Sequence, residues 1–445
     1  MYDLQLRRFS LDVALTFARQ FLAGLLKLCI ILLIANALGP KGAGSWSVAQ
    51  LLPNTLGQLL NLGLVSASVY FVASKKFELE YVWAVSRDMT VALAAIGSLV
   101  GVAVVSMAGE TIFPGVDLSL LLVAVGIFPL TLLNGVVAGL FQARQDFRHY
   151  NILALAEPTV TLTLIAMLWV TTGLTLISAL LAAVVGYGAT LLLGLVFLSG
   201  NLRLWAPATR SHLEYLRPAL RYGVFSHLGN LVSFLNYRLD IYLVNLFLGP
   251  AATGIYTVAV RLGEQVWVVS QAVSTVIFPR LSAMRSAASL RNELTVVVSR
   301  ATLWASAIVG AALLIVSEPL IAVLFGIEFQ AASWVLALLL PGIVVLSGAR
   351  VLANDLAARN MVAANFYISL GLLVANVVGT LLLIPPFGLA GAAISTSVAY
   401  GLHMGTLLVV RHRLTRDAWW HTIVPQLSDV QALLALAQKL ARRAL

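Results

Sequence analysis

The chain has 445 residues, of which 60% are hydrophobic and only 10% are charged. A soluble domain carries about 25% charged residues, so this composition excludes a soluble fold of this size. The formal net charge of +10 does not by itself indicate a nucleic-acid partner, because the charges must first be placed relative to a membrane.

Apolar runs recur along the whole chain, and many are long enough to cross a bilayer as a helix, which needs ~20 apolar residues. Only helices and closed barrels cross lipid, and continuous rather than alternating runs are typical of helices. We therefore expect an all-α integral membrane protein with about 12 transmembrane helices. They are predicted at residues 13–36, 44–72, 86–108, 118–140, 152–171, 176–198, 222–248, 253–279, 301–317, 332–353, 364–384 and 389–410.

Lys and Arg residues are distributed unequally between the two sides of these helices. Most of the 28 lie in one set of connecting segments, whereas the opposite side holds Lys41 alone. By the positive-inside rule the basic side is cytoplasmic, which places both termini in the cytoplasm. The positive charge is then a topology signal and a partner for anionic membrane lipids, and we expect no nucleic-acid partner.

A short connector occurs twice in the sequence. The chain reads LGPKGAGSWSVA from Leu38 and LGPAATGIYTVA from Leu248. Six predicted helices separate the two copies, so both lie on the outer side. The halves are therefore parallel repeats related by an axis along the membrane normal. Gly39 and Pro40 end the preceding helix sharply, because Gly suits a helix C-terminus and Pro cannot continue the helix.

The repeat predicts a V-shaped transporter of two six-helix lobes, with a substrate cavity between them and alternating access by rocking of the lobes. The N-terminal lobe is expected at 1–200, a cytoplasmic linker at 201–221 and the C-terminal lobe at 222–412. The last segment, 425–445, has helical apolar spacing and ends in basic residues. It predicts an amphipathic helix on the inner leaflet, or alternatively a frayed tail.

Charged residues inside spans cost ~3 kcal/mol or more at the bilayer centre and are functional candidates by default. Lys27 lies 12 residues before Gly39, and Arg238 lies 11 residues before Gly249. At 1.5 Å per residue both are ~16–18 Å below the outer side. Two cations at one depth suit a diphosphate, since Arg gives bidentate hydrogen bonds and Lys a compact charge. The alternative is that each belongs to a structural ion pair.

The other charges within spans leave more than one role open. Arg261 and Glu264 are spaced i,i+3, so they are expected to pair on one helix face. Such a pair is a structural element, a substrate contact or a switch for a coupling ion. Asp240 and Glu157 are further candidates for ion coupling or for an ion pair. Arg19 lies near the inner end, where it either snorkels to the interface or lines a cavity entrance.

Polar residues within the spans are candidate contacts to a sugar substrate, namely Asn54, Gln58, Asn61 and Asn236. Their side chains offer the hydrogen-bonding groups that sugars need, although such residues also bridge membrane helices without a ligand. No P-loop, zinc-protease or nucleophile-elbow motif occurs, so we expect neither an enzyme nor a resident cofactor or metal. Without a P-loop, Na+ or H+ is the expected coupling ion.

Four segments resemble the Wzx-type polysaccharide flippases. The family's first hairpin is similar to LGPKGAGSWSVAQLLPNTLGQLLNLGL, and its seventh and eighth helices to LGPAATGIYTVAVRLGEQVWVVSQAVSTVIFPRLS. Its fourth loop resembles GLFQARQDFRHYNILALAEP, and its connection into helix 10 resembles EPLIAVLFGIEFQAASWVLALLLPG. The resemblance covers residues 15–410 and rests on glycine and turn patterns in a fixed order.

This resemblance implies membership of the MOP superfamily, which also contains MATE drug exporters and lipid II flippases. It implies transport of a polyprenyl-diphosphate-linked oligosaccharide, destined for O-antigen, capsule or exopolysaccharide, across the bacterial inner membrane. Other polysaccharide assembly proteins are implied as partners. Related flippases line the cavity with cations from helices 1, 2 and 8. Helix 1 here supplies Arg19 and Lys27 and helix 8 supplies Arg261, but helix 2 has no basic residue.

Two alternative functions remain open from the sequence. A MATE-like exporter of organic cations would use membrane carboxylates, which Asp240 and Glu264 provide, although the basic helices count against it. A lipid II flippase would carry two further C-terminal spans, which the sequence does not show. A membrane enzyme is disfavoured, because the outer connecting segments are too short for a catalytic domain.

Overall fold

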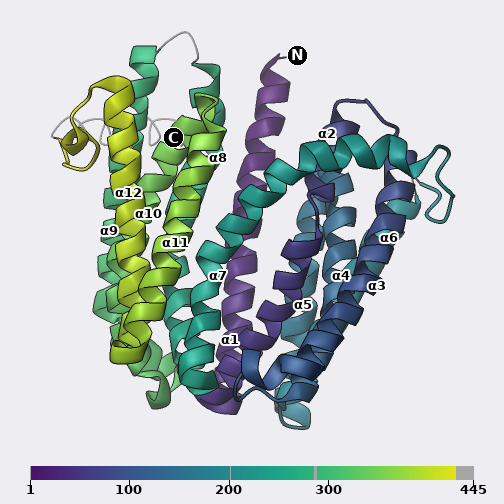
Figure 1. The fold of residues 1–445 in the computed structure, drawn as a ribbon, viewed down its shortest axis with the longest axis horizontal. Coiled ribbons are helices and arrows are strands. Elements are labelled where there is room, and N and C mark those ends of the chain that lie inside the picture. The colour runs from purple at the N-terminus through teal and green to yellow at the C-terminus, as the bar shows by residue number, and fades with distance from the viewer. Residues whose placement is uncertain (1, 201, 285–287, 427–445) are drawn as a thin grey trace, which may run out of the picture. The chain divides into compact units, whose positions relative to one another are not determined.

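The structure is a computed structural model that describes residues 2–200, 202–284 and 288–426 (Figure 1). Every regular element in these ranges is a helix. The long helices are α1 (Tyr2–Leu60), α2 (Leu64–Ala73), α3 (Leu79–Ile112), α4 (Leu118–Ala143), α5 (Phe147–Thr171), α6 (Leu176–Ser199), α7 (His212–Glu264), α8 (Trp267–Ala283), α9 (Ala288–Phe325), α10 (Ala331–Ala358), α11 (Val362–Phe387) and α12 (Leu389–Thr415). Two short 3₁₀ helices, Ile327–Phe329 and Trp419–Thr422, complete the described part.

Ten helices in the described ranges are long and apolar enough to cross a membrane. Two of them, α1 and α7, each contain a kink and each cover one predicted span and the first part of the next. The predicted class, an all-helical multi-pass membrane protein, is thus confirmed. The predicted amphipathic helix at 425–445 lies, from residue 427 onward, outside the described residues.

The two copies of the connector have the same backbone conformation. Gly39 has φ 65° and ψ −170°, and Gly249 has φ 78° and ψ −179°. This left-handed region is open to Gly and strained for residues with a Cβ. Each of these glycines is followed by a proline, at which the next helix begins. The repeat seen in the sequence is therefore a repeat of backbone geometry.

The chain divides into two compact units. Unit 1 comprises Met1–Val258 and Ile321–Ala331, and unit 2 comprises Ala259–Leu320 and Ala332–Leu445. Both connectors, and the ends of α3 and α9, belong to unit 1. The predicted lobes at 1–200 and 222–412, joined by 201–221, follow the sequence repeat instead and stay a prediction.

Within unit 1 the two connectors pack against each other reciprocally. A Cβ atom on Gly44 would collide with the carbonyl group of Pro250, and one on Gly254 would collide with the carbonyl group of Pro40. Each glycine stands five residues after the kink glycine of its own copy. The backbones therefore approach as closely as they do because both copies have Gly at this position. We call this contact the connector junction.

Two asparagines beside the connectors tie down the ends of other helices. Asn36 donates its side-chain amide to the carbonyl of Leu324 at 2.6 Å, near the end of α9. Asn245 donates to the carbonyl of Pro114 at 3.5 Å, just beyond the end of α3. The last carbonyls of a helix have no partner within the helix, so the Asn36 contact satisfies one of them in α9, and the Asn245 contact holds the turn that follows α3. They follow the same near-twofold pattern as the connector junction.

The spans that follow the connectors are broken, contrary to the prediction of continuous helices at 44–72 and 253–279. The first break lies at Asn61–Gly63, where Leu62 has φ 51° and Gly63 has φ 74°. A Cβ on Gly63 would collide with the backbone of Gly223 in α7. This close crossing requires a glycine at position 63. The second break, at Gln265 and Val266, separates α7 from α8.

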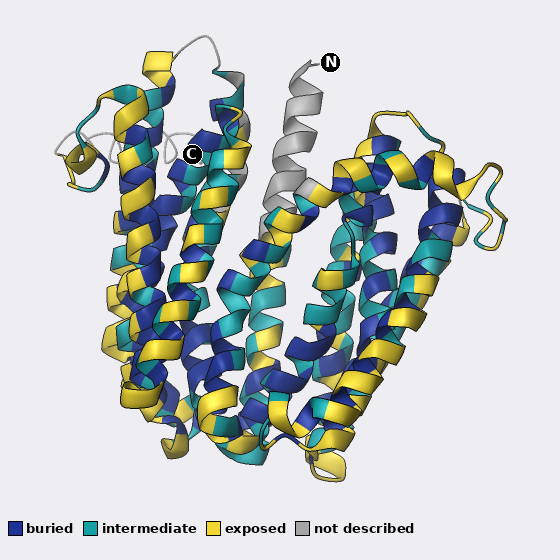
Figure 2. Cartoon of the chain, in the orientation of Figure 1, coloured by how far each residue is buried: buried dark blue, intermediate teal, exposed yellow. Residues whose placement is uncertain are grey.

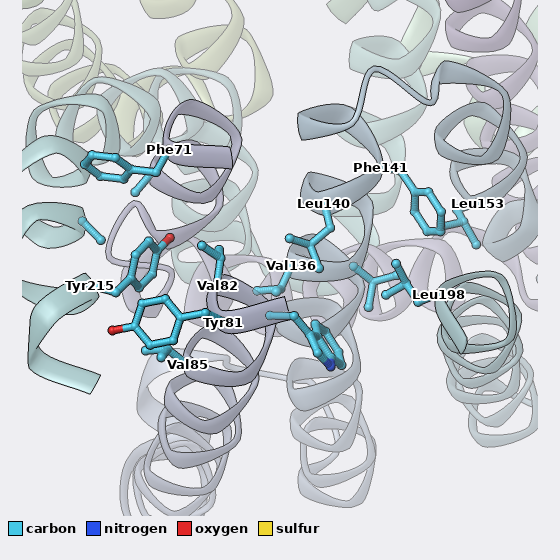
Figure 3. Close-up of a cluster of buried hydrophobic side chains, with 14 residues drawn as sticks. Phe71, Tyr81, Val82, Val85, Val136, Leu140, Phe141, Leu153, Leu198 and Tyr215 are labelled. Carbon is cyan, nitrogen blue, oxygen red and sulfur yellow. The ribbon is translucent and has the colours of Figure 1, made fainter. Parts of the chain in front are cut away.

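The core of unit 1 holds the predicted linker against α3. Figure 3 shows Tyr81 of α3 and Tyr215 of α7 with their rings close together; the ring centroids are 6.3 Å apart. The Tyr81 hydroxyl donates to the carbonyl of Ser211 at 2.7 Å, and the Trp83 indole donates to the carbonyl of Leu204 at 3.0 Å. The Tyr215 hydroxyl is 2.9 Å from that of Ser68. The linker is therefore fixed to unit 1.

Burial differs between the helices of unit 1. Half of the apolar window of α4 is buried, against 22% of that of α3. Figure 2 shows exposed residues along much of α3 and α6. In a membrane such apolar, exposed surface contacts lipid, whereas α4 packs against α1, α2, α3, α5 and α6.

Because the connector junction depends on bare backbone, we expect Gly44→Ala to destabilise the protein. Forcing a methyl group into a close-packed contact typically costs about 1–3 kcal/mol. The midpoint of thermal unfolding of the purified protein should fall. The matched control is Gly126→Ala in α4, where a Cβ has nothing within 4 Å, and its midpoint should stay or rise. Equal effects of the two variants would show that the junction is not a tight contact.

Candidate functional site

A polar cavity of about 210 Å³ lies within unit 1, around the break between α1 and α2. Three predicted sugar contacts, Asn54, Gln58 and Asn61, line it together. The complete lining is Asn54, Gly57, Gln58, Leu60, Asn61, Leu64, Val65, Thr90, Leu93, Thr131, Leu132, Gly135 and Val136. The cavity is therefore formed by α1, α2, α3 and α4, and none of its lining residues is charged. We call it the polar cavity.

The polar groups of this cavity are only partly used by the protein. The Asn54 amide donates to the carbonyl of Gln50 at 2.6 Å, and the Thr131 hydroxyl donates to the carbonyl of Phe128 at 2.7 Å. The side chains of Gln58, Asn61 and Thr90 make no hydrogen bond within the described part of the chain. Polar groups in such a place need water or a ligand.

A second cavity of unit 1, of about 270 Å³, contains one predicted phosphate ligand, Arg238. Its lining is Leu51, Leu52, Thr55, Phe113, Phe234, Leu235, Arg238, Leu239 and Tyr242. Apart from Arg238, Thr55 and the Tyr242 hydroxyl, these side chains are hydrocarbon. We call it the apolar cavity. It combines apolar walls with one guanidinium, which fits a ligand that is part hydrocarbon and part anion.

Buried polar residues surround Arg238 on α7. Asn236 and Asp240 are 3% and 5% exposed. The Asp240 carboxylate accepts hydrogen bonds from the Tyr256 hydroxyl at 2.8 Å and from the backbone N–H of Ile241 at 2.8 Å. Tyr256 lies beyond the Gly249 kink, so Asp240 joins the two arms of α7. These bonds stabilise the kinked helix, so Asp240 has a structural role in addition to any role in transport.

Lys27 and Glu157 lie near each other, a pairing that the sequence does not predict. Lys27 is exposed on α1, Glu157 is half-buried on α5, and the two charges interact electrostatically. The Glu157 carboxylate also accepts a weak hydrogen bond from the Thr161 hydroxyl at 3.4 Å. Arg19, nearer the N-terminus of α1, places its guanidinium over the ring of Tyr150 at 5.2 Å. The α1–α5 pair thus carries two cations and one carboxylate.

The expected pair of Arg261 and Glu264 is confirmed. The Arg261 Nη1 atom donates to the Glu264 Oε2 atom at 3.0 Å, at the end of α7 that belongs to unit 2. Both side chains are partly exposed, at 32% and 15%. The roles of these two residues, and of all the site residues predicted above, stay predictions.

Unit 2 holds a buried ionic cluster that sequence reasoning missed. Asp355 of α10 pairs with Arg359 at 2.8 Å and lies 3.7 Å from both Arg291 and Arg411. Arg411 in turn pairs with Asp417 at 3.0 Å. In the sequence these arginines signal topology, because they lie at predicted helix ends. The structure instead uses them to join α9, α10 and α12.

Sequence reasoning also missed Thr90, Thr131 and the helix break as parts of the polar cavity. The break has a local signal, since Asn61 and Gly63 are both residues that favour left-handed or turn conformations. The two threonines have none, because a threonine inside an apolar helix usually bonds to its own backbone, as Thr131 does.

Comparisons with known proteins agree with this fold. The chain is 25% identical, over 239 residues, to the probable low-salt glycan biosynthesis flippase Agl15 of Haloferax volcanii. That match covers 53% of this chain and 49% of the relative, so it spans about half of the length of that relative.

Two solved structures share the fold across most of the chain. An inward-facing multidrug resistance MATE transporter of the MOP superfamily has a TM-score of 0.72 at 16% identity, covering 89% of this chain and 96% of its own. The lipid II flippase MurJ, in an inward closed conformation, has a TM-score of 0.71 at 15% identity, covering 89% and 87%.

The family comparison extends over more than half of the sequence. Residues 11–285 match the family described as polysaccharide biosynthesis protein. This range includes both connectors, the polar cavity and the apolar cavity. The predicted resemblance to a polysaccharide-biosynthesis family is thereby confirmed, and the chain belongs to the polysaccharide biosynthesis protein family.

Proposed function

We propose that the protein is a flippase that moves a polyprenyl-diphosphate-linked oligosaccharide from the inner to the outer leaflet of the membrane. The observation that carries this proposal is Arg238 on the apolar cavity of unit 1. A guanidinium at the edge of a hydrocarbon-lined space matches the junction of lipid and diphosphate in such a substrate. The family, and the similarity to a relative named as a glycan biosynthesis flippase, support the same function.

In this proposal Arg238 binds the diphosphate, and the apolar cavity takes the first part of the polyprenyl chain. Lys27 contributes a second positive charge at a similar depth, ~16–18 Å from the connectors. Arg19 and Arg261 attract the diphosphate electrostatically before or after it binds Arg238. Asn54, Gln58, Asn61 and Asn236 contact the glycan. All of these are intramembrane polar groups, whose cost in a bilayer favours a functional role.

Alternating access is proposed on the basis of the repeat. Parallel repeats related by an axis along the membrane normal are built to rock against each other around a shared site. Coupling to H+ or Na+ would drive the cycle. Glu157 is the preferred coupling residue, because Asp240 already holds Tyr256 and Glu264 already pairs with Arg261.

The proposed setting is a bacterial inner membrane, with the cytoplasmic termini that the charge distribution predicts. The product would be a repeat unit for O-antigen, lipopolysaccharide, capsule or exopolysaccharide, and other polysaccharide assembly proteins would be partners. No catalytic step is assigned to the chain.

The main alternative is a MATE-like exporter of organic cations, which the similarity of fold favours as much as a flippase. Its substrate would need an anionic cavity. Both cavities described in unit 1 lack a carboxylate in their lining. A lipid II flippase is a second alternative, since that fold is equally similar.

The decisive experiment is complementation of a flippase-deficient bacterium with this chain. We expect lipid-linked glycan intermediates to reach the outer leaflet, measured by leaflet-specific labelling of the accumulated intermediates. Cells that fail to move the intermediates but gain the ability to export a cationic dye would contradict the proposal and support the alternative.

Lys27→Ala and Arg238→Ala are each expected to slow translocation at unchanged membrane insertion. Removing a hydrogen bond to a charged group costs about 1.5–3 kcal/mol, which corresponds to about a 10- to 150-fold loss of affinity for the diphosphate. Surface polysaccharide at native expression is the measurement. Lys75→Ala and Arg413→Ala, which remove exposed charges that line neither cavity, are the matched controls. Normal polysaccharide from both the Lys27 and the Arg238 variant would refute the assignment.

Glu157→Gln is expected to uncouple transport from the ion gradient, because the neutral amide cannot exchange a proton or balance Na+. In proteoliposomes the wild type should accelerate when a proton or sodium gradient is imposed, and the variant should show one constant rate. The control is Glu110→Gln at the end of α3, an exposed carboxylate that should leave the acceleration intact. A variant at Glu157 that still responds to the gradient would exclude this residue as the coupling site.

A further inference from the structure

The polar cavity has properties that diphosphate binding leaves unexplained. It has no charged lining residue, so it offers nothing to an anion. Yet Gln58, Asn61 and Thr90 carry hydrogen-bonding groups that the described part of the protein does not use. Thr90 is only 2% exposed overall and lines the cavity, so its hydroxyl is available to a ligand there. The cavity therefore fits an uncharged ligand rich in hydrogen-bonding groups.

The helix break beside this cavity points to a binding site. Leu62, a residue with a branched side chain, has φ 51°, and such strain is retained where the surrounding structure demands it, often at ligand sites. Non-helical backbone at membrane depth is tolerated where it is buried in protein or lines a cavity. In transporters, discontinuous helices commonly form the substrate site.

One span presents both cavities, on neighbouring faces. Leu51, Leu52 and Thr55 line the apolar cavity, and Asn54 and Gln58 line the polar cavity. At about 100° per residue these two sets occupy adjacent sectors of the helix surface. Asn54 and Asn61 lie 10 and 17 residues beyond Gly44, or ~15 and ~26 Å along the helix, whereas Arg238 lies ~16 Å from Gly249. The polar cavity therefore extends from about the depth of Arg238 to positions farther from the connectors.

We propose that the polar cavity is a subsite for one uncharged sugar of the lipid-linked glycan, bound by Gln58, Asn61 and Thr90. This inference rests on the proposed function and specifies that the transported glycan carries an uncharged sugar at this position. Amide and hydroxyl side chains both donate and accept hydrogen bonds, as sugar hydroxyls do. A uronic acid is disfavoured, because its carboxylate would lose water without gaining a cation. Neutral hexoses and acetamido sugars fit.

The test compares two probe lipids on the purified full-length protein. One is polyprenyl diphosphate carrying a single neutral hexose, and the other is the same polyprenyl diphosphate without sugar. Dissociation constants are measured by native mass spectrometry for the wild type and for the double variant Gln58→Leu/Thr90→Val. These substitutions keep the side-chain size and remove the hydrogen-bonding groups. Thr163→Val, on an exposed position of α5, is the matched control.

The double variant should bind the sugar-bearing lipid about 5- to 30-fold more weakly, from the loss of two neutral hydrogen bonds. Its binding of the sugar-free lipid should stay within about twofold of wild type, which also shows that the variant is folded. Arg238→Ala should weaken the binding of both lipids. The wild type should bind a hexose-bearing lipid more tightly than one that carries the corresponding uronic acid.

Two results would overturn the sugar subsite while leaving the flippase in place. One is equal weakening of both lipids in the double variant, and the other is no weakening of either lipid. A wild type that prefers the uronic acid would also overturn it. Failure of the wild type to bind either lipid is different, because it would overturn the proposed function itself and the subsite with it.

Discussion

The structure of unit 1 depends on two pieces of bare backbone that touch. Gly44 lies against the carbonyl of Pro250 and Gly254 lies against the carbonyl of Pro40, so each connector is the other's packing surface. The helical segments before the connectors end beside this contact, and the segments after them begin there. The contact also sets the positions from which Asn36 and Asn245 reach the ends of α9 and α3. The depths of Lys27 and Arg238 are counted from the same point.

The two cavities of unit 1 differ in their chemistry. An apolar space with one guanidinium and a polar space without charge lie on adjacent faces of a single span. A ligand that is hydrocarbon at one end, anionic in the middle and hydroxylated at the other end can contact the apolar walls, the Arg238 guanidinium and the polar cavity together. The carboxylates lie elsewhere, and most already have a protein partner. Asp240 bonds to Tyr256 and Glu264 bonds to Arg261, whereas Glu157 interacts with Lys27 and accepts only a weak hydrogen bond from Thr161 at 3.4 Å.

Much of this could be predicted from the sequence, because the main signals are local. Hydropathy locates the spans, and the paired Gly-Pro motif locates the kinks at Gly39 and Gly249. The helix break at Asn61–Gly63 was not predicted although Asn61 and Gly63 give a weak local signal, whereas its close approach to Gly223 cannot be inferred from local sequence. The meeting of Lys27 with Glu157 likewise requires the packing of α1 on α5. The burial of Arg291 and Arg411 depends on Asp355 in another helix.

The reciprocal packing of the connectors has a consequence for synthesis. The surface around Gly44 is complete only when Gly254 has left the ribosome, 210 residues later. At about 5–20 residues per second this interval lasts roughly 10–40 seconds. During this interval the first hairpin is in the membrane without its packing partner, while five further predicted helices are inserted. The contact between the connectors therefore forms late in synthesis, after both halves of unit 1 have been made.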